Sequence, residues 1–272
     1  GSAVVAGEVS RSNIDDYVFM TRMPDSVSLG WERGYRRLGQ DLSLKKVIHT
    51  SMDDYLIIAR REPTGSQEYL IRTGSSGVVQ WARTVPGNAH YADAALLKGG
   101  GFLLVGTNGL PLLTRIESLG TIVSNRRYNT GNNNDEFIAI TEMPTGTFVI
   151  AGQRDYATLG NQQDAWLIGT DSIGTPVWER RLGNLFQEEI TDLSATQQGN
   201  LLLSGYQDRS TGSEPLLIKT DSLGQALCEF GSDSTGFTNI SGNTSPVLIT
   251  TINPNFQLNN RFQIAHGMAG KN

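Results

Sequence analysis

An internal repeat constrains the fold of this chain more than any other feature of the sequence. A segment of three mostly apolar residues, usually followed by glycine, occurs five times. The last residues of successive copies are 53, 46, 46 and 53 positions apart. A repeat of this length is typical of solenoids and propellers, in which each repeat is one supersecondary unit. We name this segment b; its copies are Val4–Gly7, Ile57–Arg60, Leu103–Gly106, Val149–Gly152 and Leu202–Gly205.

A second apolar segment, c, follows each copy of b after a polar loop, and a tight turn follows c. In the last two repeats the turn reads Asp-Ser-x-Gly, and Trp178 or Cys228 stands four residues after the glycine. Asp or Ser caps backbone N–H groups at the start of such a turn, and Gly adopts the left-handed conformation of a hairpin bulge. We therefore expect another strand, d, to begin near the tryptophan position. The c segments are Tyr17–Thr21, Tyr69–Thr73, Leu112–Ile116, Trp166–Thr170 and Leu216–Thr220.

A further strand candidate, a, lies between the repeats. Four antiparallel strands in roughly 49 residues correspond to one blade of a β-propeller. Segments such as Val149–Ala151 and Trp166–Ile168 are apolar on both faces. A sheet with one solvated face would alternate, so this pattern favours blades packed face to face. The a segments are Leu44–Thr50, Tyr91–Leu97, Glu136–Met143 and Glu189–Ala195.

The b-c-d set occurs five times, which predicts an all-β fold of five four-stranded antiparallel blades over residues 1–231. Strand d is polar, as in Trp178–Arg181, and we interpret it as an outermost edge protected by charge. The first repeat starts at b, and Val247–Ile252 is the one strand-like segment left to complete it. Residues 232–272 are therefore either a closing strand that pairs with Val4–Gly7 or a C-terminal linker.

Charge and composition exclude several classes of protein. The chain has 22 Lys and Arg against 27 Asp and Glu, a net charge of −5, which argues against a nucleic-acid surface. No apolar run approaches the roughly 18 residues of a membrane helix. The single cysteine, Cys228, forms neither an intrachain disulfide nor a cysteine-built metal site, and the three histidines have no metal-ligand spacing. We therefore expect no metal, no cofactor, no membrane span and no nucleic-acid partner.

The run Trp166–Trp178 and its copy Leu217–Gly224 resemble the propeller repeats of secreted and cell-surface proteins of Bacteroidota. Proteins of that kind are typically exported by the type IX system, so the resemblance, which covers about residues 3–231, implies an extracellular or cell-surface location. The Asp-x-x-Gly-x-x-x-Trp spacing is also similar to the tryptophan-docking repeat of quinoprotein propellers. Those have eight blades and a vicinal cysteine pair, so the single cysteine gives no support for a quinone site.

The loops that enter strand a are polar and would ring one mouth of the central channel, the usual binding face of a propeller. One interpretation is an acidic rim that binds a cation or a polyhydroxylated ligand at the cell surface. The alternative is that Asn and Asp cap turns there. The candidate residues are Asp41, His90, Tyr91, Asp93, Asn134, Asp135, Glu136, Glu188 and Glu189.

The loop between b and c is longest in the fourth repeat, at Gln153–Gln163. There the end of b and the start of d are 26 residues apart, against 18 to 24 elsewhere. Tyr and Arg are favoured at interfaces, so Arg154, Asp155 and Tyr156 are candidates for a partner contact. The alternative is an insertion that costs little to close.

The tryptophans have two interpretations. Trp31, Trp81 and Trp178 recur at one repeat position beside a tight turn. This regularity favours packing between blades over sugar-stacking platforms. Trp166 lies in segment c and is expected in the core.

Two classes of function remain. The first is a non-catalytic binding or scaffolding module for a protein or glycan partner, and it is the one we favour. The second is a carbohydrate-active enzyme that uses Asp135, Glu136, Glu188 or Glu189 as acid and as base or nucleophile. These carboxylates occupy equivalent positions in neighbouring repeats, and nothing distinguishes one as the acid. A strongly perturbed, channel-facing pair would favour the enzyme.

Overall fold

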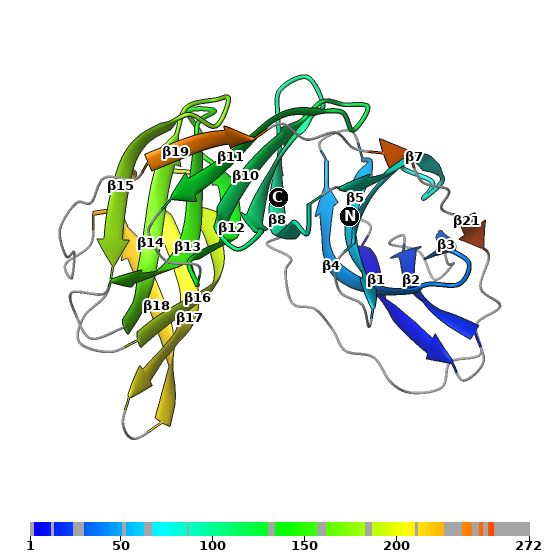
Figure 1. The fold of residues 1–272 in the computed structure, drawn as a ribbon, viewed down its shortest axis with the longest axis horizontal. Coiled ribbons are helices and arrows are strands. Elements are labelled where there is room, and N and C mark those ends of the chain that lie inside the picture. Colours follow the sequence, from blue (N-terminus) through cyan, green and yellow to red (C-terminus); the bar gives the residue numbers. More distant parts are fainter. Residues whose placement is uncertain are drawn as a thin grey trace. The chain divides into compact units, whose positions relative to one another are not determined.

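The computed structural model describes residues 3–11, 14–23, 30–50, 53–62, 67–85, 87–129, 134–156, 162–182, 187–209 and 212–225, and the backbone of strands at 236–240, 245–246 and 250–252 (Figure 1). Every ladder between these strands is antiparallel, and the described residues contain no helix. The predicted all-β class is confirmed. None of the described segments is a helix long and apolar enough to cross a membrane.

The chain divides into two compact units. Unit 1 holds the described residues of Gly1–Pro86 and Ser245–Asn272, and unit 2 those of Gly87–Thr244. Unit 1 contains two sheets, and β4 of the second packs against β1 and β2 of the first. Its strands are β1 (Ala3–Arg11), β2 (Ile14–Met23), β3 (Trp31–Arg36), β4 (Asp41–His49), β5 (Tyr55–Glu62), β6 (Glu68–Thr73), β7 (Val79–Val85), β20 (Ser245–Pro246) and β21 (Thr250–Ile252).

Unit 2 contains three sheets that follow one another. In it, β12 packs against β8, β9 and β10, and β16 packs against β12, β13 and β14. Its strands are β8 (His90–Leu96), β9 (Phe102–Thr107), β10 (Pro111–Ile116), β11 (Ile122–Asn129), β12 (Glu136–Glu142), β13 (Phe148–Tyr156), β14 (Gln162–Thr170), β15 (Pro176–Leu182), β16 (Gln187–Ala195), β17 (Leu201–Arg209), β18 (Gly212–Thr220) and β19 (Gly236–Ile240).

The predicted strand order is confirmed in the three repeats whose four strands are all described. Each pairs in the order a, b, c, d, as β4 to β7, β8 to β11 and β12 to β15. The first repeat shows b, c and d as β1, β2 and β3, and the fifth shows a, b and c as β16, β17 and β18. The expected d strand at Cys228 lies outside the described residues.

The sheet of β12 to β15 is apolar on both faces, as its sequence predicted. Alternate residues, such as Ile150 and Trp166, pack in a core shared with the sheet of β8 to β11. Their neighbours in sequence, such as Ala151 and Leu167, pack in a second core shared with the sheet of β16 to β18. Side chains alternate between the two faces of a strand, so a strand covered on both sides loses its polar alternation.

The recurring glycine of segment b faces a β-bulge in strand a. A Cβ on Gly106 would lie 1.9 Å from the carbonyl oxygen of His90, and one on Gly152 would lie 2.2 Å from that of Glu136. Only glycine admits such a close approach of backbone to backbone. The same arrangement holds in the last sheet. The bulges fall between Leu44 and Lys46, Tyr91 and Asp93, Phe137 and Ala139, and Ile190 and Asp192.

This register corrects the alignment of the second repeat by one residue. Leu44, the first residue of its bulge, pairs with Ala59, whereas the corresponding Tyr91 pairs with Gly106. Ala59, rather than Arg60, is therefore equivalent to the glycines. Because that repeat has no glycine, its sequence alone did not set the register.

Two of the repeated tryptophans pack on the c–d turn of the following sheet, as expected. In unit 1, Trp31 Nε1 donates to the carbonyl of Ser75 at 2.9 Å, and a Cβ on Gly77 would lie 2.7 Å from the indole. In unit 2, a Cβ on Gly224 would lie 3.0 Å from Trp178. Trp166 is fully buried, as predicted. The tryptophans thus join sheets, and the turn glycines make room for them.

The prediction for the chain's C-terminal segment was wrong in its pairing. Thr250–Ile252 pairs with β3 and not with β1, where Val4–Gly7 lies; residues 247–249 lie outside the described part. Val247–Ile252 is also not the one strand beyond residue 231, since β19 pairs with β11 (orange beside green in Figure 1) and β20 with β7. Strand d is therefore not an outermost edge in three of the sheets.

Candidate functional site

The predicted rim residues lie at one end of the sheets, where strand a begins, strand b ends and strand c begins. Asp41 starts β4 and His90 starts β8. Asn134 and Asp135 directly precede β12, and Glu188 and Glu189 are near the start of β16. The repeat thus places them equivalently, each within its own unit.

Three of the predicted acids are used to hold backbone. Asp93 accepts from the N–H of Ile140 in β12 at 3.2 Å and from its own neighbour Ala94 at 2.9 Å. Asp135 is fully buried and accepts from the N–H of Asp155 at 2.8 Å. Asp41 accepts from the N–H of Asp16 at 2.8 Å. These carboxylates therefore bind the backbone of other strands rather than capping their own turns, and they stabilise neighbouring strands.

Tyr91 belongs to the core rather than to the rim. It is 1% exposed, and its hydroxyl donates to Thr114 Oγ1 at 2.6 Å. Thr114 in turn donates to Asn125 Oδ1 at 2.6 Å, so the buried polar atoms form one chain. His90 is half-buried at the start of the same strand, and Asn134 is exposed with its carbonyl 3.5 Å from Gln163 Nε2.

Arg154, predicted as a partner contact, contacts side chains of neighbouring strands in its own sheet. Its Nη1 lies 2.8 Å from Glu179 Oε1, which also accepts from Trp166 Nε1 at 2.7 Å. The guanidinium lies 5.4 Å from the centroid of the Trp166 ring, a cation–π arrangement. The hairpin remains paired out to Tyr156 and Gln162, and residues 157–161 lie outside the described part. Asp155 contributes its backbone N–H to Asp135.

A buried carboxyl pair joins the last two sheets of unit 2. Asp164 of β14 and Glu188 of β16 are 0% and 1% exposed, and their carboxyl groups hydrogen-bond to each other. Gln207 donates to Glu188 at 2.5 Å, and Arg181 pairs with Asp164. Burial, followed by Glu188, raises the pKa of Asp164 to about 7 against the attraction of Arg181. Asp164 therefore retains a proton up to near neutral pH.

Glu136 and Glu189 form a more accessible carboxylate pair at the same end of unit 2. Both are half-buried. Burial and then the charge of Glu189 raise the pKa of Glu136 above its ordinary value. The hydroxyl of Tyr206 hydrogen-bonds to Glu189, and this bond raises the pKa of Tyr206 to about 12. Glu189 of β16 is thus linked by its charge to Glu136 of β12 and by a hydrogen bond to Tyr206 of β17.

Gln153 adds an amide to this group. It pairs directly with Glu136 across β12 and β13, so the two side chains lie on one face of the sheet. Gln153 is 4% exposed, and its Nε2 has no hydrogen-bond partner among the residues that the structure describes. A buried amide donor of this kind usually has a partner. We name Glu136, Gln153, Glu189 and Tyr206 the Glu136 site.

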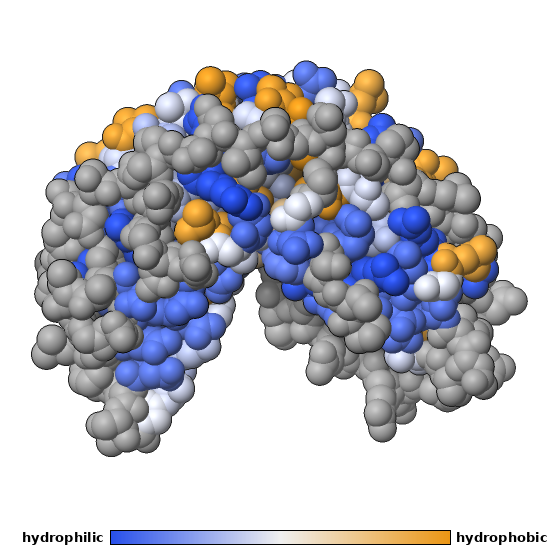
Figure 2. All heavy atoms as spheres, in the orientation of Figure 1, coloured by the Kyte–Doolittle hydropathy of each residue, from blue (hydrophilic) through white to orange (hydrophobic). Residues whose placement is uncertain are grey.

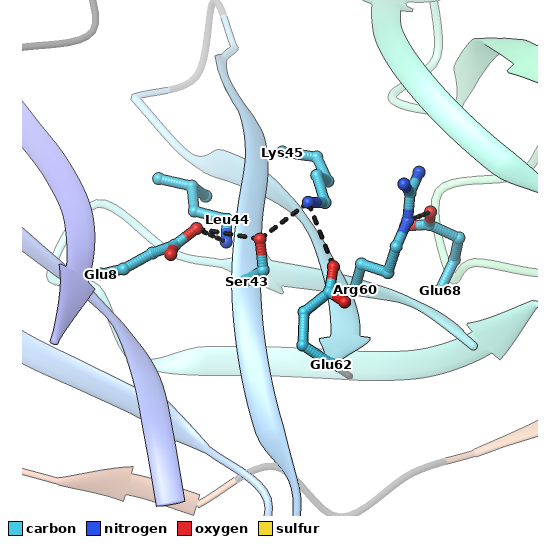
Figure 3. Close-up of polar contacts among 7 residues, drawn as sticks. All are labelled: Glu8, Ser43, Leu44, Lys45, Arg60, Glu62 and Glu68. Atoms are coloured by element: carbon cyan, nitrogen blue, oxygen red, sulfur yellow. Dashed lines mark hydrogen bonds and ion pairs between the residues drawn. The ribbon is translucent and has the colours of Figure 1, made fainter. Parts of the chain in front are cut away.

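A second polar cluster occupies the corresponding end of unit 1 (Figure 3). Glu8 of β1 accepts from Ser43 Oγ at 3.0 Å and from the N–H of Leu44 at 2.5 Å. Lys45, the extra residue of the bulge in β4, donates to Ser43 Oγ at 2.7 Å and lies 3.5 Å from Glu62. Glu8 thus links the two sheets of unit 1 at the backbone that the bulge displaces.

Behind this cluster, Arg60 Nε lies 2.6 Å from Glu68 (Figure 3). Glu68 is fully buried, and burial raises its pKa to about 7 despite the nearby charge of Arg60. A carboxyl group without access to solvent does not reach a substrate. Glu68, like Asp164, therefore has a structural role although its pKa is strongly perturbed.

Every side chain of the unit 1 cluster is engaged within it. Ser43 Oγ donates to Glu8 and accepts from Lys45, whose ammonium lies 3.5 Å from Glu62. Among the described residues, no group of three or more His, Cys, Asp or Glu is arranged to hold a metal ion, so the cation interpretation of the rim has no ligand set here.

Sequence reasoning missed Asp164, Arg181 and Lys45. The candidates came from the loops that enter strand a and from the Gln153–Gln163 loop, whereas Asp164 and Arg181 belong to strands c and d. A signal was present, since a charged residue on an otherwise apolar face, as in Asp164-Ala165-Trp166, requires a partner of opposite charge on the neighbouring strand.

Comparisons with known proteins do not add to this description. No protein-family model matches the sequence, and a search of curated proteins finds no match. The functional argument therefore rests on the residues of the chain itself.

Proposed function

We propose that this chain is a five-bladed β-propeller that acts as a non-catalytic binding module, extracellular or at the cell surface, for a glycan or protein partner. Five repeated sheets, of which the sheet of β12 to β15 carries two apolar faces, support the propeller. The location rests on the resemblance of Trp166–Trp178 and Leu217–Gly224 to the repeats of exported proteins.

The Glu136 site is the observation that carries the binding function. Asp41, Asp93 and Asp135 hold backbone, whereas Glu136 and Glu189 are half-buried, with Gln153 paired beside Glu136 and the Tyr206 hydroxyl bonded to Glu189. A few fixed polar groups of both donor and acceptor type suit the hydroxyls of a sugar. An amphipathic tyrosine adds apolar area at the same place.

Hydrolysis of a glycan is the alternative function, and one observation favours it. Burial and Glu189 raise the pKa of Glu136, as a general acid requires. The two most strongly perturbed carboxyls, Glu68 and Asp164, are both fully buried and therefore offer no second catalytic group. The geometry thus supports binding over catalysis.

A glycan-array screen tests the proposal on the full chain. We expect wild-type protein to retain a subset of glycans, and the double variant Glu136→Gln/Glu189→Gln to lose them. Glu142→Gln is the matched control, because Glu142 is exposed at the opposite end of the same strand. Binding that survives in the double variant would exclude the Glu136 site.

Chromogenic glycosides separate the two functions. If the chain is a binding module, we expect no release of chromophore and no loss of bound glycan on prolonged incubation. Turnover that Glu136→Gln abolishes and Glu142→Gln preserves would establish the enzyme instead.

A further inference from the structure

A row of exposed aliphatic side chains lies at the end of unit 2 opposite the Glu136 site, where strand c turns into strand d. The third residue of each turn is exposed, at 67% for Leu119, 47% for Ile173 and 48% for Leu223. Val123 and Val177, each the extra residue of a bulge near the start of strand d, are 48% and 70% exposed. We name these five residues the aliphatic row.

The fold does not require apolar residues at these positions. Ile173 contributes only its N–H to the turn, which Asp171 Oδ1 accepts at 3.0 Å together with that of Thr175 at 2.7 Å. In the sheet of β4 to β7, the same turn carries Ser76 in place of the exposed Leu or Ile, and its bulge carries Gln80 in place of Val. Polar residues thus form the same turn and bulge.

Two contacts connect the turns of the row across the three sheets of unit 2. Arg126, three residues after Val123, donates to the carbonyl of Gly174 at 2.7 Å, which places the β11 edge against the turn of Ile173. Trp178, next to Val177, lies against Gly224, which follows Leu223. Figure 2 shows hydrophobic side chains gathered along the edge of unit 2 at which β10 and β11, and β14 and β15, are joined.

Carboxylates accompany the aliphatic residues. Each turn of the row opens with an acidic residue, Glu117, Asp171 or Asp221, and the sheet of β4 to β7 has Gly74 at that position. Glu117 and Asp221 are exposed. Asp171 and Asp221 each accept two N–H groups of their own turn, and their charges, with that of Glu117, stand beside the aliphatic residues along one edge.

We propose that the aliphatic row docks a cationic amphipathic peptide segment of a partner protein. Apolar residues of the segment cover Leu119, Ile173 and Leu223, and its Lys or Arg residues face the turn carboxylates. Exposed apolar side chains that recur along one edge favour an interaction surface, and complementary charge selects the partner. The aliphatic row is separate from the Glu136 site, so the docking proposal can be tested independently of the proposed function.

The test replaces the aliphatic turn residues by the serine that the second repeat has at the same position. The triple variant Leu119→Ser/Ile173→Ser/Leu223→Ser copies Ser76 into the three turns, and Val78→Ser is a control at an exposed aliphatic residue outside the row. The probe is a short fluorescein-labelled peptide of alternating Leu and Lys, titrated with the full chain in a fluorescence anisotropy assay. We expect the triple variant to bind more than about tenfold more weakly than wild type, and Val78→Ser to bind as wild type does.

Unchanged melting temperature in the triple variant shows that the loss is not unfolding. A peptide of alternating Leu and Glu should not bind. Equal binding of the Lys peptide to wild type and triple variant, absent binding to wild type, or equal binding of the Glu peptide would overturn the proposal. Self-association in sedimentation velocity that the triple variant abolishes would overturn it in favour of a second copy of this chain.

Discussion

The indole of Trp178 lies directly over Gly169, its cross-strand neighbour. The two residues pair between β14 and β15, and a Cβ on Gly169 would lie 2.0 Å from Trp178 Cε2. The same indole also approaches Gly224 of the next turn. The absence of a side chain at Gly169 thus leaves space for the indole, and the indole in turn contacts the turn of the following sheet.

Gly169→Ala should therefore displace Trp178. A methyl group inserted under a packed side chain costs about 1–3 kcal/mol of stability. We expect a lower urea midpoint and a changed tryptophan emission spectrum. Gly74→Ala is the control, because its new methyl group would meet only the end of a flexible glutamine at 3.3 Å. A Gly169→Ala protein as stable as the control would show that the indole moves freely.

Gly152→Ala should destabilise unit 2 through a different contact. Its methyl group would meet the carbonyl oxygen of Glu136 at 2.2 Å, and backbone cannot rotate away as a side chain does. We expect a loss of about 1–3 kcal/mol in the free energy of unfolding. The reverse change at the equivalent position, Ala59→Gly, should cost only about 0.5–1 kcal/mol through chain entropy. Chemical denaturation gives the free energy of unfolding of both variants. Similar losses in Gly152→Ala and Ala59→Gly would contradict the proposed equivalence of the two positions.

Asp164 should make stability fall with rising pH. Its pKa is about 7 in the folded chain and near 3.8 when unfolded, so the folded state binds more protons between these values. Stability due to this group is therefore complete below pH 4 and is lost as pH rises toward 7. Asp164→Asn should flatten the pH dependence of the unfolding free energy over that window.

Glu68→Gln provides the matching measurement in unit 1, since burial raises the pKa of Glu68 to about 7 as well. Both variants should show a flatter profile than wild type when urea midpoints are measured from pH 4 to pH 8. A slope in Asp164→Asn equal to that of wild type would mean that Asp164 ionises normally in the folded chain.

Truncation after residue 235 should cause aggregation. It removes β19, β20 and β21, which pair with β11, β7 and β3. The three d strands would then present unpaired N–H and C=O groups, which recruit other chains. Light scattering of the truncated and full-length chains at equal concentration is the measurement. A truncated chain that stays monomeric would show that the charged side chains of strand d protect its edge unaided.

Local patterns were sufficient for the strands and for their order. The Asp-Ser-x-Gly turn specifies a hairpin by itself, because Asp171 binds N–H groups two and four residues ahead and Gly174 takes a φ of 84°. A run of consecutive apolar residues within one strand likewise indicates that both faces of the sheet are covered. The candidate site was predicted less well. Loop position suggested Asp93 and Asp135 as ligand groups, but their partners, Ile140 and Asp155, belong to other strands.

By itself, the sequence determined an all-β chain of repeated a-b-c-d sheets, because turns, short apolar segments and tryptophan spacing are encoded within a few residues of one another. Only the tertiary structure decided which carboxylates are buried in hydrogen bonds or ion pairs and which remain accessible to solvent. Asp164 and Glu188 are 24 residues apart in the sequence yet hydrogen-bond to each other in the interior, whereas Glu136 stays half-buried. The same holds for Thr250–Ile252, whose pairing with β3 depends on which edge lies within reach. Burial and pairing between distant segments depend on how the sheets pack, and no local pattern contains that information.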